Sequence, residues 1–176
     1  DSSWAIAGYQ ALIDLETAKP HGLDVKPLKF IEQLWGDEVD LAARDWADSG
    51  ECDVIYFHGN YNDIIDGMRD DYPDQMLIEI GSGYIDHRDN NYHAWFRCHE
   101  GSYLMGMMAG LLTEGEYVSV VGTYPANDVN DNINAYFAGA KSVNPELKQQ
   151  VAFINSWYDP VLSSEAAQAQ FAAGSD

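Results

Sequence analysis

Two tryptophans with nearby carboxylates are the residues of this sequence best suited to hold a small molecule. Trp4 and Trp157 lie in opposite halves of the chain, each where a helix is expected to begin, with Asp1 and Asp159 close by. An indole ring stacks on a planar heterocycle, which is worth about 0.5–1.5 kcal/mol beyond the burial of area. A carboxylate accepts hydrogen bonds from sugar hydroxyls or ring N–H groups. These residues favour capture of a small aromatic ligand; the alternative is that the tryptophans pack under their own helices and the aspartates cap them.

Patterns for catalysis or for metal binding are weak by comparison. The segment 81–83 (GSG) lacks the spacing of a nucleophile elbow, and neither a P-loop nor a dinucleotide-binding glycine pattern occurs. His87, His93 and His99 match no zinc-binding spacing, and residues 128–131 (DVND) lack the glycine and the glutamate of a calcium loop. We therefore predict a binding protein rather than an enzyme, with no catalytic residue, no metal site and no cofactor.

Helices and strands alternate along the sequence. Apolar residues at helical spacing, such as Ile6, Tyr9 and Ile13, and short β-branched runs between turn residues mark the elements. They predict helices over residues 1–18, 37–48, 62–69, 100–112, 128–143 and 161–173, and strands over residues 28–34, 53–57, 75–80, 92–97, 117–121 and 150–155. Gly106 and Gly110 in the fourth of these helices predict close packing against a neighbour. Such alternation is typical of an α/β protein with mostly parallel sheets and helices on both faces.

In open α/β sheets, ligands collect at the carboxyl ends of the strands, where loops lead into helix N-termini. The loops at such positions are residues 1–4, 58–61, 81–84, 122–124 and 156–159. They contain many aromatic, glycine and small polar residues. Gly59 and Tyr124 therefore join the candidate ligand-binding residues.

The order of the elements predicts two lobes that extend beyond this sequence. In a doubly wound lobe the first strand lies in the middle of the sheet, but here the first element is a helix. The second half offers only two strands after its first helix. We expect a first lobe over residues 1–96 that lacks its first strand, and the start of a second lobe over residues 97–176.

The charge limits the partners. The net charge is −20, from 29 acidic and 9 basic residues, so nucleic acids and anionic membranes are repelled. The acidic residues are scattered rather than gathered in one tail. This pattern favours a highly solvated surface, and the alternative is adaptation to high salt.

Several motifs occur together in an order that resembles a known family. They are residues 1–4 (DSSW), 53–59 (DVIYFHG), 99–106 (HEGSYLMG), 109–112 (AGLL), 138–145 (AGAKSVNP) and 155–160 (NSWYDP). This set resembles the basic membrane protein family, the substrate-binding lipoproteins of ABC transporters that are similar to the purine nucleoside receptor. The resemblance implies a type I periplasmic-binding-protein fold with two Rossmann-like lobes, of which this chain lacks the first strand and the C-terminal half.

The same resemblance implies how a ligand is held. Aromatic rings from the two lobes sandwich the base in this family, and the matching positions here are Trp4 and Trp157. The matching polar contacts are Asp1, Ser3, Asn60 and Asp159. The expected partners are a purine nucleoside or base and an ABC permease, the expected location is extracytoplasmic, and any membrane attachment is through a lipid anchor outside this stretch. Capture follows from hinge closure between the lobes.

Two departures from the family pattern leave the ligand open. Tryptophan stands where nucleoside binders often have phenylalanine, and residues 122–125 (GTYP) differ from the commoner glycine pair. A nucleoside, a free base and another heterocycle all remain candidates. The alternative function is a ligand-sensing receptor or regulator domain of the same fold, because fold alone does not fix function.

Overall fold

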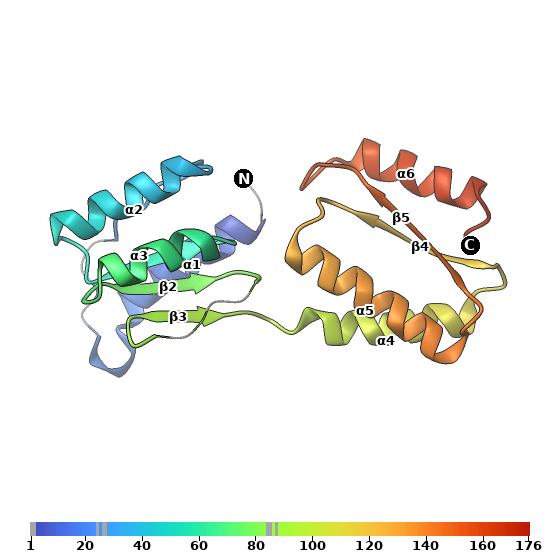
Figure 1. Cartoon of the computed structure of the whole chain (residues 1–176), viewed down its shortest axis with the longest axis horizontal. Coiled ribbons are helices and arrows are strands. Elements are labelled where there is room, and N and C mark those ends of the chain that lie inside the picture. The colour runs from blue at the N-terminus through green and yellow to red at the C-terminus, as the bar shows by residue number, and fades with distance from the viewer. Residues whose placement is uncertain (1–2, 24, 26–27, 84–85, 87) are drawn as a thin grey trace. The chain divides into compact units, whose positions relative to one another are not determined.

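Two separate hydrophobic cores organise the chain. The computed structural model describes residues 3–23, 25, 28–83, 86 and 88–176, and it divides into two compact units over residues 1–95 and 96–176 (Figure 1).

The first unit contains a parallel three-stranded sheet. Its elements are α1 (Ser3–Ala18), the 3-10 helix η1 (Pro20–Gly22), α2 (Asp37–Ser49), β1 (Val54–His58), α3 (Asn62–Asp71), β2 (Met76–Ile80) and β3 (Asn91–Ala94). The strands lie in the order β1-β2-β3. Phe57 pairs with Glu79, which pairs in turn with His93. The carboxyl ends of all three strands therefore meet at one edge of the sheet.

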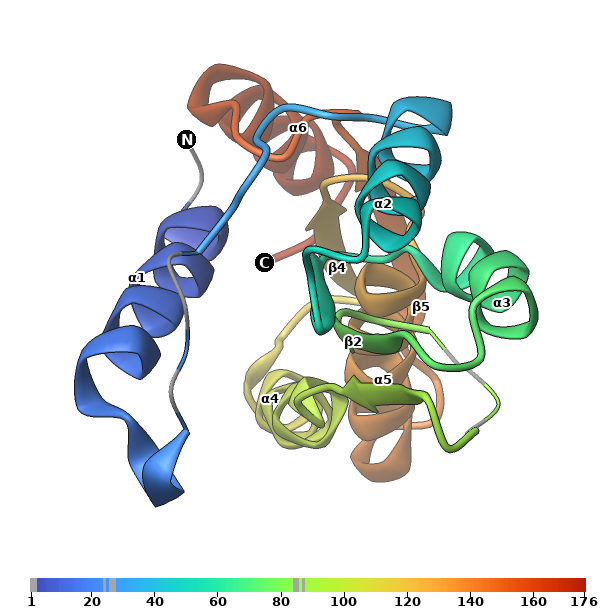
Figure 2. The same ribbon diagram turned by 90° about the vertical axis from the view of Figure 1, so that its left-hand side faces the viewer.

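The core of the first unit lies between this sheet and two helices. Ile55, Phe57 and Leu77 from the strands pack with buried residues of α2 and α3, among them Ile65 and Met68. Alternate residues of β1 and β2 are buried, as expected where one face of a strand packs on helices. Figure 2 shows α1 on the opposite side of the strands from α3.

The strand predicted over residues 28–34 is wrong, because among the described residues this segment forms neither helix nor strand. Its apolar side chains do not enter a sheet: Phe30 is 54% exposed and packs edge-on against Tyr9 of α1, with ring centroids 5.0 Å apart. Gln33 has a positive φ of 62°, which a strand does not allow. The apolar alternation here reflects packing on a helix rather than pairing with a strand.

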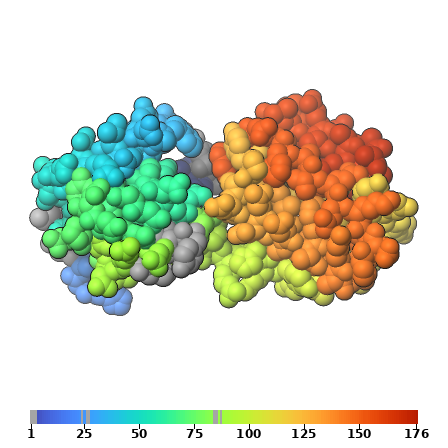
Figure 3. All heavy atoms as spheres, in the orientation of Figure 1, coloured from blue at the N-terminus to red at the C-terminus, as the bar shows by residue number. Residues whose placement is uncertain are grey.

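The second unit contains a pair of parallel strands between helices. Its elements are α4 (Cys98–Leu112), β4 (Tyr117–Gly122), α5 (Asn127–Val143), β5 (Lys148–Phe153) and α6 (Pro160–Ala172). Val118 packs with Ile133, Phe137 and Ala140 of α5, so α4 and α5 cover one face while α6 covers the other (Figure 1). In the space-filling view α2 and α3 cover the near face of the first unit, and α5 and α6 form much of the near face of the second (Figure 3).

Glycines allow α4 and α5 to approach closely, as the sequence predicts. A Cβ on Gly106 would collide with the carbonyl oxygen of Tyr136, and one on Gly110 would lie 2.6 Å from the carbonyl oxygen of Ala140. Gly139 of α5 makes the reciprocal approach to the backbone of Tyr103. Side chains at these positions would force the helices apart.

The predicted α/β class with parallel sheets is confirmed, and the other eleven predicted elements appear within a few residues of their expected bounds. None of the helices in the described part of the chain combines the length and apolar character that a bilayer span requires. The strand predicted over residues 92–97 ends early, at Ala94, one residue before the first unit ends.

Candidate ligand-binding site

An aromatic cluster forms at the carboxyl edge of the first unit's sheet. The indole of Trp4, in the first turn of α1, stacks on the imidazole of His58 at the end of β1, with ring centroids 4.5 Å apart and planes 17° from parallel. Trp95, which follows β3, meets Trp4 edge-on at 5.5 Å. Trp4 remains partly exposed. The ring therefore packs within its own unit, and part of its surface still meets solvent.

Hydrogen bonds fix the imidazole of His58. Its Nε2 lies 2.8 Å from the backbone carbonyl oxygen of Trp4, which can only accept, so Nε2 carries a proton and donates. Its Nδ1 lies 2.7 Å from the hydroxyl of Tyr56, and in the neutral imidazole this nitrogen accepts from the hydroxyl. The ring also fills the space beside Gly8, where a Cβ would lie 2.5 Å from the imidazole.

A buried carboxylate holds the loop that follows β1. Glu79 of β2 is fully buried, and its Oε1 accepts from the backbone N–H of Tyr61 while its Oε2 accepts from Nδ2 of Asn62, each at 2.6 Å. These donors lie at the N-terminus of α3, where a negative charge is favoured. His93 donates from Nε2 to the carbonyl oxygen of Gly81 at 2.6 Å and lies 3.8 Å from Glu79. Side chains from β2 and β3 and the loop that follows β1 thus organise this edge.

Burial raises the pKa of Glu79 above its ordinary value. The N–H of Tyr61, the imidazole of His93 and the amide of Asn62 act in the opposite direction, because each stabilises the carboxylate. A charge removed from water needs such partners. The donors of the loop thus stabilise the charged form of Glu79, and the carboxylate in turn holds these donors in place.

The loop itself contains two of the predicted residues. Gly59 has a φ of 154°, and its carbonyl oxygen occupies the place that a Cβ on Gly81 would take. Asn60 is exposed. The close approach of Gly59 and Gly81 lets the loops after β1 and β2 lie together, and it leaves Asn60 facing solvent.

A second aromatic cluster forms at the carboxyl edge of the second unit's strands. Tyr124 lies in the loop between β4 and α5, and Trp157 lies in the loop between β5 and α6. Their ring centroids are 5.2 Å apart, and Trp157 is 54% exposed. The structure thus brings together two residues that the sequence selected separately, and it leaves much of the indole free to contact a ligand.

Asp159 is the N-cap of α6. Its Oδ1 accepts from the backbone N–H groups of Val161 and Leu162 at 3.0 and 2.9 Å. The capping role considered from the sequence is present, and the remaining carboxylate oxygen has no capping bond to these two groups. A ligand-binding role stays a prediction.

Other residues considered from the sequence lie wholly or partly outside the described residues. Asp1 lies outside the described residues; Ser3 begins α1, but its side chain is outside them. His87, considered as a metal ligand, also lies outside them. Among the residues that the structure does describe, no group of three potential metal ligands comes together.

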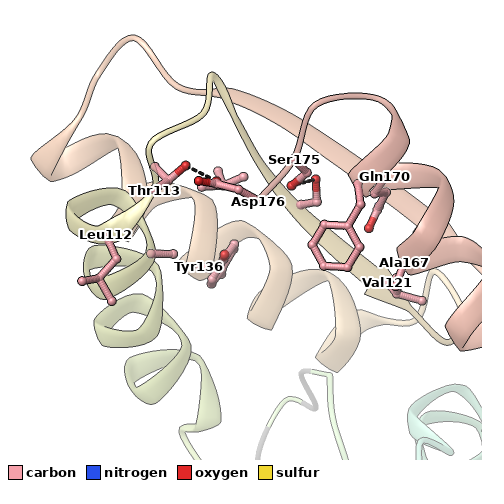
Figure 4. A pocket seen from close by; sticks show the side chains of 12 residues that line it. Leu112, Thr113, Val121, Tyr136, Ala167, Gln170, Ser175 and Asp176 are labelled. Carbon is pink, nitrogen blue, oxygen red and sulfur yellow. Dashed lines mark hydrogen bonds between the residues drawn. The ribbon is translucent and has the colours of Figure 1, made fainter.

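A hollow of about 370 Å³ in the second unit is lined by neither Tyr124 nor Trp157. It is bordered by the end of α4, by β4 and by α6, and several of its polar side chains bond to one another or to the backbone (Figure 4). Thr113 donates to Asp176, Ser119 bonds Ser175 at 2.7 Å, and Gln170 donates to the carbonyl oxygen of Val120 at 3.0 Å. We therefore do not assign the ligand to this hollow.

Sequence reasoning missed the roles of two residues. His58 was placed in a candidate loop, but its stacking on Trp4 depends on contact between residues 54 positions apart. Glu79 did carry a signal, because an acid interrupts the apolar run of residues 76–80 (MLIEI), where burial demands a partner.

The chain thus consists of two α/β units, each with parallel strands flanked by helices and with aromatic side chains at the carboxyl edge of those strands. A solute-binding protein of an ABC transporter system from Aeropyrum pernix superimposes on this chain with a TM-score of 0.70 at 20% identity, over 94% of this chain and 47% of that protein. The likeness shows the fold.

The chain belongs to the family of PnrA-like ABC transporter substrate-binding proteins, whose model matches residues 1–176. This is the basic membrane protein family that the motifs resemble, so the recognition is confirmed. A protein of Haloferax volcanii named as an ABC transporter glucose-binding protein, TsgA13, is 37% identical over the whole chain and 44% of its own length. A purine-binding protein of Brucella abortus is 27% identical over the whole chain and 49% of its own length. The chain spans about half the length of these curated relatives.

Proposed function

We propose that this protein captures a planar aromatic molecule, a purine nucleoside or base, for an ABC importer. One observation carries the proposal. In each unit a tryptophan lies with other aromatic rings at the carboxyl edge of parallel strands: Trp4 in the first turn of α1, and Trp157, which is more than half exposed, in the loop after β5. Exposed indoles at such an edge suit stacking on a heterocycle.

Family membership and the purine-binding relative support the same ligand class. Capture without turnover is the role proposed, with an ABC permease as partner. The location proposed is outside the cytoplasm, with any membrane attachment through a lipid anchor.

Hinge closure is the mechanism that we propose for capture, with the two units acting as the two lobes. A ligand that contacts Trp4 and Trp157 together binds best to the arrangement in which both contacts are made. It therefore shifts the population toward that arrangement, by no more than its differential affinity. Asp1, Ser3, Asn60 and Asp159 are the proposed polar contacts, and Gly59 and Tyr124 shape the loops around them.

Calorimetric titration of the purified protein with adenosine, guanosine, adenine and glucose tests this proposal. Saturable binding of at least one purine is expected. Trp4→Ala and Trp157→Ala should each weaken that binding about 10-fold or more, which corresponds to about 1.4 kcal/mol. Trp35→Ala is the matched control, because Trp35 is 71% exposed and lies between elements, outside both aromatic clusters.

Each other outcome has a definite meaning. Purine affinity that is unchanged in both cluster variants refutes stacking by these two indoles. Saturable binding of glucose without binding of any purine replaces the ligand class with the one named for the Haloferax volcanii relative.

A further inference from the structure

His58 covers part of the Trp4 indole and is bonded to the backbone of the same residue. The stacking at 4.5 Å and the hydrogen bond of 2.8 Å act on one tryptophan from one side chain. The stack restrains the plane of the indole, and the hydrogen bond restrains the first turn of α1 relative to the end of β1. Together they restrict where the indole can point.

The surroundings of His58 restrict the imidazole in turn. Tyr56, on the same strand, holds Nδ1 at 2.7 Å, and the absence of a side chain at Gly8 provides the space that the ring occupies. Gly8 follows Trp4 by four residues, so both lie on one face of α1. The imidazole of His58 therefore packs on one face of α1, against the indole of Trp4 and in the space left by Gly8.

We propose that His58 is a positioning residue for ligand binding: it orients the indole of Trp4 and occupies one of its faces, so that a planar ligand stacks only on the part that His58 leaves open. The proposal deepens the proposed function and rests on it. It assigns a purpose to a histidine that has no metal or catalytic partner in the described cluster. The chemistry is that of an aromatic stack extended by one member, imidazole–indole–ligand.

Substitutions at His58 and at Gly8 disturb the stacking of the imidazole on Trp4 in different ways. His58→Ala deletes the imidazole, whereas Gly8→Ala keeps it and fills its space, and alanine also favours the helix. His58→Phe keeps a flat ring and loses both hydrogen bonds. His99→Ala is the matched control, because His99 lies in α4 of the second unit.

The orientation of the indole is measured first, without ligand. The indole N–H resonance of Trp4, assigned with Trp4→Phe, should move in His58→Ala and in Gly8→Ala and stay in place in His99→Ala. Far-ultraviolet circular dichroism establishes that each variant retains its secondary structure. If one variant fails to fold, the other carries the test.

Affinity for adenosine and guanosine is measured next. His58→Ala and Gly8→Ala should weaken binding by about 3- to 10-fold, since a misplaced ring loses its stacking contribution, and His58→Phe should lose less. A moved resonance with unchanged affinity overturns the proposal, and so does an unmoved resonance. If the wild-type protein binds none of adenosine, guanosine and adenine, the proposed function fails for purines, and an unmoved Trp4 resonance in His58→Ala and Gly8→Ala would then separately overturn the positioning of Trp4 by His58.

Discussion

Replacing Glu79 by methionine should loosen the loop after β1 far more than replacing it by glutamine. The fully buried carboxylate accepts from the N–H of Tyr61 and from the amide of Asn62 through different oxygens, each at 2.6 Å. Methionine fills a similar volume but accepts from neither. Both donors are then left without their partner, in a region where water has limited access.

The magnitude follows from those two bonds. A buried donor that loses its acceptor costs about 1–3 kcal/mol, and removal of a buried charge returns part of that cost. We expect Glu79→Met to lower the free energy of unfolding of the first unit by about 2–4 kcal/mol. In Glu79→Gln the remaining oxygen can keep Tyr61, and the new amide can donate to Asn62 once that side chain turns its own amide over. The glutamine variant should therefore lose about 1 kcal/mol.

Amide hydrogen exchange and urea unfolding measure the two effects. Exchange of the Tyr61 amide should accelerate in Glu79→Met while amides of β4 in the second unit stay protected. Glu38→Met is the matched control, because Glu38 is an exposed acid in the same unit. If Glu79→Met matches the wild type in both measurements, the carboxylate does not hold the loop and the reasoning is refuted.

Three further predictions concern packing, capping and pH. Gly106→Ala should destabilise the second unit by about 1–3 kcal/mol in urea unfolding, because the added methyl meets the backbone of α5, whereas Gly101→Ala in the same helix has open space and should cost nothing. Asp159→Ala should lower stability by about 1 kcal/mol in thermal unfolding through loss of the α6 cap, and Asp159→Asn should preserve most of it; equal losses would contradict the capping argument. Burial raises the pKa of Glu79, so the folded state binds the proton more tightly than the unfolded state. The free energy of unfolding of the wild type, measured relative to that of Glu79→Gln, should therefore fall as pH rises from about 4.5 through the raised pKa. A relative free energy of unfolding that rises over this range would contradict the prediction.

The sequence predicts local features of this fold well where one segment determines them. The α4 glycines predicted close packing because a missing side chain has one geometric consequence wherever the helix lies. Residues 28–34 show the limit of such reasoning. Their apolar alternation satisfies a strand pattern, but strand formation needs a partner in a sheet, and Phe30 finds Tyr9 of a helix instead.

The candidate site could be predicted as a set of loops but not as a set of contacts. The carboxyl-edge rule selected Trp4, Tyr124 and Trp157 because it needs only the order of strands and helices. Which rings touch depends on register and helix placement, and no local pattern reports that Trp4 stacks on His58 or that Tyr124 meets Trp157.

The tryptophans of the two aromatic clusters differ in how many contacts hold them. Trp4 is held by a stack, an edge contact and a backbone hydrogen bond, whereas Trp157 is 54% exposed and its described ring contact is with Tyr124 alone. A pre-positioned ring loses little conformational freedom on binding, and an exposed ring contributes more newly buried area. Loss of Trp157 should therefore weaken binding by removing buried area, so Trp157→Phe should retain more affinity for the ligand than Trp157→Ala. Loss of Trp4 should instead weaken binding by changing the geometry of the ring, so the ligand affinity of Trp4→Phe should depend on whether His58 is present.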